Sequence, residues 1–172
     1  INNLEVTEHT SDIKKYVAYI PEMVSLYPNL SGIENLNFFA SLAGFNLPKE
    51  ELAQLLSKAG LQENAHNKPL SGYSKGMRQK VGIAIAISKN AKALFLDEPT
   101  SGLDPKASNE FSKIIKQLSE SDTAILMATH DIFRAKQVAD SIGVLRSGDF
   151  VSQIKAADIS ANELEELYLK TV

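Results

Sequence analysis

The sequence contains no cysteine among its 172 residues. This absence excludes a disulfide scaffold, an iron–sulfur cluster and a thiol nucleophile, and it is compatible with a reducing compartment. A basic excess is also lacking, because 18 lysines and arginines are set against 21 aspartates and glutamates, for a net charge of −3. A broad nucleic-acid-binding surface normally carries such an excess, so this composition disfavours nucleic acid as a partner.

Long apolar runs are absent too, since none approaches the roughly 20 residues that a membrane-spanning helix needs. The first residues, Ile-Asn-Asn-Leu-Glu-Val, have neither an initiator methionine nor a signal-peptide pattern, and we expect them to come from the interior of a longer chain. Hydrophobic residues make up 44% and charged residues 23% of the sequence. This composition is typical of a globular domain with a buried core.

Three apolar runs, at 93–96, 124–128 and 142–145, predict buried strands. Because each run is almost continuously apolar, we expect strands covered on both faces, as in a parallel sheet. A helix is predicted over 105–118, where a proline suits the first turn and apolar residues recur at helical spacing. Strands that alternate with helices predict an α/β fold.

The first half of the chain predicts a short strand followed by an inserted helical segment. Ser31 and Glu34 have the spacing of a capping box at a helix start, and Gly60 ends a second helix. A C-terminal helix is also expected. The strand and the three helices are predicted at 17–20, 31–43, 48–59 and 161–170.

Asp97 and Glu98 directly follow the apolar run 93–96. In an α/β sheet, ligands bind beyond the carboxyl ends of the strands. Adjacent acidic residues on an extended backbone point to opposite sides, so one carboxylate can hold magnesium while the other faces a water. Taken in isolation, however, such a pair is more often an ordinary acidic turn.

Three further motifs change this interpretation. Residues 99–105 read Pro-Thr-Ser-Gly-Leu-Asp-Pro, the next strand ends in Thr-His-Asp at 129–131, and Tyr-Ser-Lys-Gly-Met-Arg-Gln-Lys at 73–80 begins a helical run to Ile87. In this order the motifs resemble the ATP-binding subunit of ABC transporters. The resemblance covers nearly the whole chain, and residues 96–105 carry its most specific part.

The resemblance implies a P-loop NTPase fold with an ABC-type ATPase core, in which helices flank a mostly parallel sheet and an α-helical signature subdomain is inserted. It divides the chain into the Q-loop and helical subdomain at about 25–88, the core with the Walker B motif, D-loop and switch histidine at 89–150, and a C-terminal tail at 151–172. The implied cofactors are ATP and Mg²⁺.

The catalytic residues implied by the resemblance are Glu98 and His130. Glu98 matches the glutamate that polarises the attacking water, and His130 matches the histidine that contacts the γ-phosphate. Asp97 matches the aspartate that orients magnesium, a hard cation that prefers oxygen ligands. Without the surrounding motif, a lone histidine after a strand would be read as structural.

Ser74 and Gly76 match the signature loop, whose hydroxyl and backbone amides form an anion site at a helix start. The family pattern is Leu-Ser-Gly-Gly-Gln, so this chain departs from it at Tyr73, Lys75 and Met77. An earlier Leu-Ser-Gly at 70–72 is set aside, because alignment on it would misplace the helix. The alternative interpretation is a glycine-containing helix start without a ligand.

Two further positions follow from the resemblance. Glu22 stands where the family usually has the Q-loop glutamine, and its carboxylate is expected near the metal-bound water and the nucleotide, although it adds negative charge beside phosphate. Asp104 belongs to the D-loop, which crosses the interface between two nucleotide sites. His9 and His66 have no such context, and we expect both at the surface.

No Gly-x-x-x-x-Gly-Lys-Ser/Thr pattern, which cradles phosphates in this family, occurs in the 172 residues. We therefore expect this stretch alone to be inactive. Residues 1–5 resemble the strand that follows the phosphate-loop helix. Without the preceding segment, the sheet of residues 93–145 is expected to expose an edge or an apolar face.

The resemblance implies two partners, a membrane permease and a second ATP-binding subunit, at the cytoplasmic face of the membrane, with no nucleic acid. Residues 33–36 and 77–80 resemble the exporter-like subfamily. One alternative is a soluble ABC-type ATPase acting on nucleic acid or ribosomes, although no coiled-coil insertion or tandem cassette is present. Another is a non-catalytic remnant that contributes only its signature loop to a nucleotide site.

Overall fold

The computed structural model describes residues 1 and 3–171. The chain forms two compact units, residues 1–128 and 129–172, and each is described by itself. The first unit contains a parallel sheet and most of the helices, and the second contains a β-hairpin with two helices.

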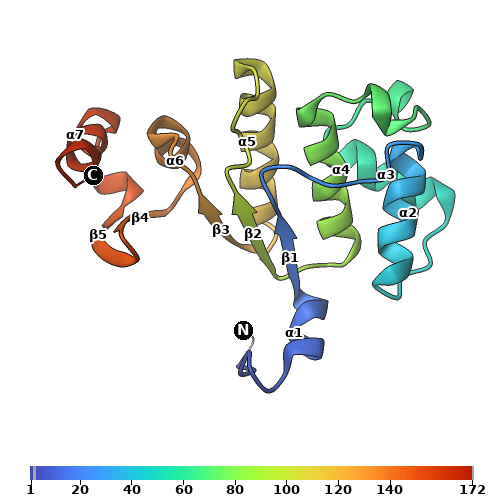
Figure 1. Cartoon of the computed structure of the whole chain (residues 1–172), viewed down its shortest axis with the longest axis horizontal. Coiled ribbons are helices and arrows are strands. Elements are labelled where there is room, and N and C mark those ends of the chain that lie inside the picture. The colour runs from blue at the N-terminus through green and yellow to red at the C-terminus, as the bar shows by residue number, and fades with distance from the viewer. Residues whose placement is uncertain (2, 172) are drawn as a thin grey trace. The chain divides into compact units, whose positions relative to one another are not determined.

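The sheet of the first unit has three parallel strands in the order β1–β2–β3, as Figure 1 shows. They are β1 (Val17–Ile20), β2 (Ala93–Asp97) and β3 (Ala124–Ala128). The α/β class and the strands predicted at 17–20, 93–96 and 124–128 are therefore confirmed. Because the strands are parallel, their carboxyl ends meet at one edge of the sheet, where β2 ends at Asp97.

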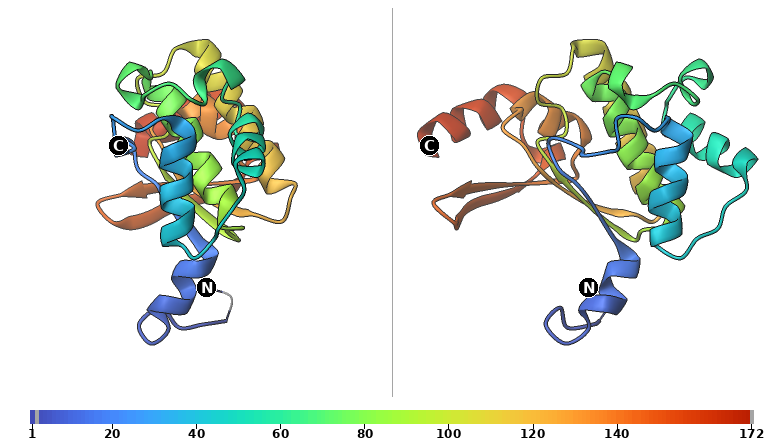
Figure 2. Two further views of the ribbon diagram at one scale, coloured as in Figure 1. Left: turned by 90° about the vertical axis from the view of Figure 1, so that its right-hand side faces the viewer. Right: turned by 45° about the vertical axis from the view of Figure 1, so that its right-hand side comes forward.

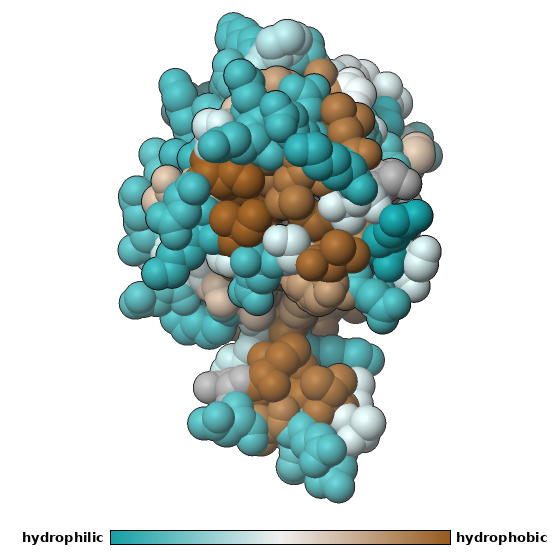
Figure 3. All heavy atoms as spheres, turned by 90° about the vertical axis from the view of Figure 1, so that its left-hand side faces the viewer, coloured by the Kyte–Doolittle hydropathy of each residue, from teal (hydrophilic) through white to brown (hydrophobic). Residues whose placement is uncertain are grey.

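One face of this sheet is packed and the other is open. Ala18, Leu94 and Ile125 share a register position on the packed face, which belongs to the hydrophobic core. On the opposite face, the side chains of Tyr19 and Leu126 are 60% and 65% exposed. The prediction of strands covered on both faces was wrong for the chain as it stands, whereas the expected exposed apolar face is confirmed. Figure 3 shows apolar residues at the surface on the face of the chain that it draws.

The predicted helices form within about two residues of their expected bounds. Ser31 caps the first of them with a complete capping box, in which its hydroxyl oxygen accepts from Glu34 N and the Glu34 carboxylate accepts from Ser31 N. The bounds of these helices are α2 (Gly32–Leu42), α3 (Lys49–Lys58), α4 (Lys75–Ser88) and α5 (Pro105–Ser119), with short 3₁₀ turns at Glu63–Ala65 and Leu70–Gly72. Helices α4 and α5 pack on the sheet, and α2 and α3 pack on α4 and on each other (Figure 2).

The start of the chain differs from the expectation. Within residues 1 and 3–5 there is no strand; instead, Leu4 N donates to Ile1 O in a turn. A strand needs a neighbouring strand to satisfy its backbone groups, and here the backbone bonds locally. The chain then enters α1 (Thr10–Tyr16), which the sequence interpretation did not predict.

The second unit contains an antiparallel hairpin of β4 (Ser141–Arg146) and β5 (Asp149–Lys155). The apolar run 142–145 was expected in the parallel sheet, and this prediction was wrong, because the run folds back through a two-residue turn. Ser147 and Gly148 both have positive φ, 53° and 92°, as a tight hairpin turn requires. The hairpin is accompanied by α6 (Ile132–Val138), a 3₁₀ turn at Ala156–Asp158 and α7 (Ala161–Thr171).

The two histidines outside the motifs behave differently. His9 is exposed, as expected. His66 is only 4% exposed, so its prediction as a surface residue was wrong. Its Nε2 lies 3.1 Å from Leu61 O, and its own carbonyl accepts from Ile33 N, so the residue joins α2 to the segment after α3. Among the residues described, no helix has the length and apolar character needed to cross a membrane.

Candidate functional site

The Asp97 side chain is exposed at the carboxyl end of β2, as the motif predicts. The Tyr19 hydroxyl of the neighbouring strand β1 donates to Asp97 Oδ2 over 3.3 Å. Desolvation, reinforced by the Asp97 charge and this hydrogen bond, raises the pKa of the Tyr19 hydroxyl. Tyr19 therefore stays a protonated donor that orients the carboxylate. The two residues are 78 positions apart, and no local sequence pattern links them.

Glu98 does not continue the extended strand. Its φ is +42°, in the left-handed region that few non-glycine residues adopt. Its backbone N–H donates to Ala128 O of β3, and its carbonyl accepts from Ser101 N in the turn that follows. The neighbouring strand and the turn thus hold Glu98 in a strained conformation, which is a feature that clusters at functional sites.

Ser74 lies at the N-terminus of α4. Its side-chain oxygen accepts from Met77 N at 3.3 Å, so it caps the helix. The hydroxyl is exposed, and a capping serine still has its own O–H to donate to an anion. The helix begins at Lys75 and not at the earlier Leu-Ser-Gly, which occupies a separate 3₁₀ turn at Leu70–Gly72.

The start of α4 lies against the start of α5. A Cβ built on Gly76 would lie 3.5 Å from the side chains of Leu103 and Ala107. Asp104 is the N-cap of α5, and its Oδ1 accepts from Ala107 N at 2.9 Å. The structure therefore brings the signature loop and the D-loop segment together within one chain, and it gives Asp104 a capping function beside the ligand role predicted for it.

The Glu22 carboxylate joins three segments. Its Oε1 accepts from Lys75 Nζ over 3.2 Å and from Ser101 Oγ over 2.9 Å. Lys75 is 53 positions away and Ser101 is 79, so these contacts connect the turn after β1, the start of α4 and the turn after β2. Sequence reasoning treated Lys75 only as a departure from the family pattern and missed this contact.

Tyr73 is also explained by the structure. Its ring is buried, and its hydroxyl donates to Ala65 O over 2.6 Å. Burial raises the pKa of this hydroxyl. A Cβ built on Gly32 would lie 2.6 Å from the Tyr73 oxygen, so glycine is needed where α2 passes this side chain. The tyrosine thus anchors the residue before Ser74, a packing function that sequence reasoning missed.

His130 belongs to the second unit. It is exposed and immediately precedes Asp131, whose Oδ1 accepts from Arg134 N and caps α6. Thr129 Oγ1 accepts from Asp131 N, so the turn that carries the histidine is locally ordered. In the first unit, hydrogen bonds link Glu22 to the start of α4 and to the turn after Glu98, and Gly76 lies against the residues that flank Asp104. Asp97 contacts Tyr19 at the end of β2, and His130 belongs to the second unit.

Oxygen is the only donor that Asp97 and Glu22 can offer, and both carboxylates are exposed. Magnesium prefers oxygen ligands, keeps several waters and takes only one or two carboxylates together with substrate phosphates. Among the described residues no group of three or more His, Cys, Asp or Glu side chains could hold a metal alone. The donor set therefore fits magnesium that is shared with a nucleotide and does not fit an all-protein cage.

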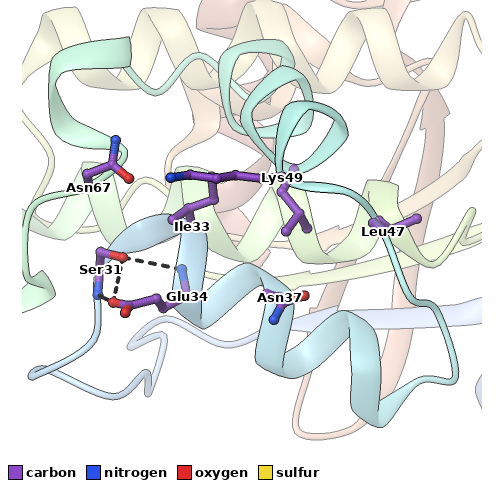
Figure 4. Close-up of a pocket in the computed structure, with 8 residues that line it drawn as sticks. Ser31, Ile33, Glu34, Asn37, Leu47, Lys49 and Asn67 are labelled. Atoms are coloured by element: carbon purple, nitrogen blue, oxygen red, sulfur yellow. Dashed lines mark hydrogen bonds between the residues drawn. The ribbon is translucent and has the colours of Figure 1, made fainter.

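Two pockets lie away from these motif residues. A pocket of about 430 Å³ is lined by residues of α2, α3 and the segment near Asn67, beside the Ser31–Glu34 capping box (Figure 4). A second, of about 370 Å³, lies between Leu61 and Lys80. Neither is lined by Ser74, Asp97 or Glu98. The Asp97 and Ser74 side chains are exposed at the surface, which suits a site completed by further groups.

The fold of this chain is similar to that of solved ATP-binding subunits. A solved structure titled an ATP-binding subunit of an ABC transporter superposes with a TM-score of 0.81 and 28% identity, covering 99% of this chain and 74% of that one. The dimeric ATP-binding cassette MJ0796, bound to ADP and Pi, superposes with a TM-score of 0.76 and 25% identity, covering 90% and 69%. The fold is therefore that of an ABC ATPase cassette.

Residues 1–101 match the sequence profile of the ABC transporter family, and the chain belongs to that family. The uncharacterised ABC transporter ATP-binding protein YdbJ of Bacillus subtilis (strain 168) is 36% identical over 86% of this chain and 48% of its own length. The lantibiotic transport ATP-binding protein SrtF of Streptococcus pyogenes is 35% identical over 91% of this chain and 66% of its own. The chain thus spans about half to two thirds of these relatives.

Proposed function

We propose that the protein containing this chain is the ATP-hydrolysing subunit of an ABC transporter. Its hydrolysis would drive substrate movement, most consistently export, through a separate membrane permease at the cytoplasmic face of the membrane. The observation that carries the proposal is the sheet edge, where exposed Asp97 and the strained Glu98 lie at the end of β2. Family membership supports ATP hydrolysis in general.

The residues of the chain divide the chemistry among themselves. Glu98 accepts a proton from the attacking water. The carboxylate of Asp97, oriented by the Tyr19 hydroxyl, would hold the magnesium ion. Bound magnesium would supply charge neutralisation at the phosphates. Ser74 and the free amides of α4 form the opposite half-site for anionic phosphate, and His130 contributes an imidazole donor to the γ-phosphate.

The signature side is proposed to act in trans, on nucleotide held by a second ATP-binding subunit. Ser74 is exposed at the surface, as expected for half of an interface site. The phosphate-cradling pattern does not occur in these 172 residues, so we propose that this stretch alone does not hydrolyse ATP. We also propose that residues 25–88 form the Q-loop and helical subdomain, residues 89–150 the catalytic core, and residues 151–172 a C-terminal tail.

An exposed aromatic cluster supports docking of a membrane partner on the helical segment. Tyr27 and Phe38 are 47% and 37% exposed, and their rings meet edge to face at 4.9 Å. Phe39 packs against both rings, and Met23 nearby in sequence is 74% exposed. Exposed apolar clusters mark interaction sites. The transported substrate is proposed to be antibiotic-like, as the name of the lantibiotic transport relative suggests for that protein.

The test uses the full-length protein that carries this sequence. Glu98→Gln keeps the size of the side chain and removes the base, so the variant should bind ATP with magnesium and accumulate as an ATP-dependent dimer in size-exclusion chromatography. Glu120→Gln, at an exposed position after α5, is the matched control, and it should form no more ATP-dependent dimer than the unmutated protein. A Glu98→Gln protein that remains monomeric and fully active would refute the proposal.

A further inference from the structure

Lys75 is the first residue of α4, and its ammonium group lies where the start of α4 meets the turns that follow β1 and β2. Its Nζ lies 3.2 Å from Glu22 Oε1, and the same oxygen accepts from Ser101 Oγ. A Cβ built on Gly102 would lie 3.9 Å from Lys75 Nζ, so the lysine tip also lies beside the turn after β2. The ion pair thus links the start of α4 to the turns that follow β1 and β2.

The charges at these two positions balance each other. The family pattern has neutral residues at both, a glutamine and a glycine, whereas this chain has Glu22 and Lys75. A carboxylate beside nucleotide phosphates repels them, and a lysine within hydrogen-bond distance offsets that repulsion. Two departures that look separate in the sequence are therefore one charge-compensated pair in the structure.

We propose that Lys75 is a positioning residue for ATP hydrolysis: it holds the Glu22 carboxylate against Ser101 and cancels its charge, so that an acidic residue is tolerated beside the nucleotide. This inference rests on the proposed function. Lys75 acts through Glu22 and need not touch the nucleotide itself.

An ordinary surface ion pair is the competing explanation. The side chains of Lys75 and Glu22 are 30% and 48% exposed, and such pairs contribute little to the stability of a fold. A purely structural pair would therefore leave the kinetics unchanged. A positioning pair affects the affinity for anionic nucleotide, and its effect weakens as salt screens the charges.

The experiment measures MgATP hydrolysis by the full-length protein with Lys75→Met, Lys75→Gln and Lys75→Arg. Both neutral variants should raise KM for MgATP about two- to five-fold with kcat little changed, because removal of the lysine charge leaves more negative charge beside the nucleotide. Lys75→Arg keeps the charge and should keep KM. Lys58→Met removes an exposed lysine from α3 as the matched control and should leave KM unchanged.

Two further measurements separate positioning from simple packing. The KM difference should shrink as salt rises from about 0.05 M to about 0.5 M. The double variant Glu22→Gln/Lys75→Met should have a lower KM than Lys75→Met alone, because it also removes the negative charge of the Glu22 carboxylate. A KM that does not respond to either neutral variant, or a double variant with additive losses, would overturn the inference. An unmutated protein without ATPase activity would instead overturn the proposed function, and the inference with it.

Discussion

Gln79 offers a stringent test of the packing around α4. The side chain is 1% exposed, and neither its Oε1 nor its Nε2 has a hydrogen-bond partner among the residues described. A buried polar group left without a partner costs about 1–3 kcal/mol. Replacement by methionine keeps the volume nearly constant, and such exchanges cost less than about 1.5 kcal/mol.

Gln79→Met should therefore raise the free energy of unfolding by about 1 kcal/mol, because the amide's desolvation cost disappears. Urea unfolding of the 172-residue chain, followed by circular dichroism, measures this change. Gln117→Met is the matched control, since Gln117 is exposed on α5, and it should change the stability by no more than about 0.5 kcal/mol. A clear loss of stability in Gln79→Met would show that the amide is paired, for instance with a buried water, and would refute this reasoning.

Three further outcomes are expected. Ser74→Arg in the full-length protein should leave ATP affinity of the monomer unchanged while dimer-dependent turnover is lost, and an equally steep fall of monomer affinity would contradict the signature assignment. Hydrogen bonds from Ser31 lower the pKa of Glu34 below its ordinary 4.5, so this pair stabilises the fold above that pH, and the contribution disappears as the pH falls below it. In Glu34→Gln the stability should therefore depend less on pH below 4.5, as acid titration of the two proteins measures. Gly148→Ala forces a Cβ onto a φ of +92° and should lower the thermal midpoint by an amount equivalent to about 1 kcal/mol, whereas Gly72→Ala, with open space around it and no positive φ, should not.

The sequence predicted the elements that carry strong local signals. Helix α5 has a proline in its first turn and an apolar face that packs into the core, and β2 and β3 are short apolar runs. The Ser31–Glu34 capping box was likewise visible in the spacing of two residues. Such features depend on the local chain alone, which is why they could be read in advance.

The elements that were missed depend on partners. Strand β5 (Asp149–Lys155) exists because the chain turns back at Ser147 after β4, and the interpretation of 142–145 as a strand of the parallel sheet did not include a second strand after that turn. Residues 1–5 resemble a strand, but a strand forms only where a neighbour pairs with it. The seven-residue helix α6 gave too short a pattern to identify.

In the candidate site, too, locally encoded features were predicted and features that depend on tertiary contacts were missed. The pair Asp97 and Glu98 was predicted from its motif, but the left-handed φ of Glu98 was not, because it results from the turn and from β3. The hydrogen bond from Tyr19 and the ion pair of Lys75 with Glu22 connect residues far apart in the chain. Contacts of this kind follow from the tertiary fold and have no local signature.

The central claim is that Glu98 is the base of an ATP-hydrolysing site. Phosphate release from MgATP by the full-length protein tests it most directly, with Glu98→Gln and Glu120→Gln measured at equal concentration. The account predicts clear activity in the unmutated protein and in Glu120→Gln, with a loss of about 100-fold or more in Glu98→Gln. Activity that survives in Glu98→Gln would contradict the claim.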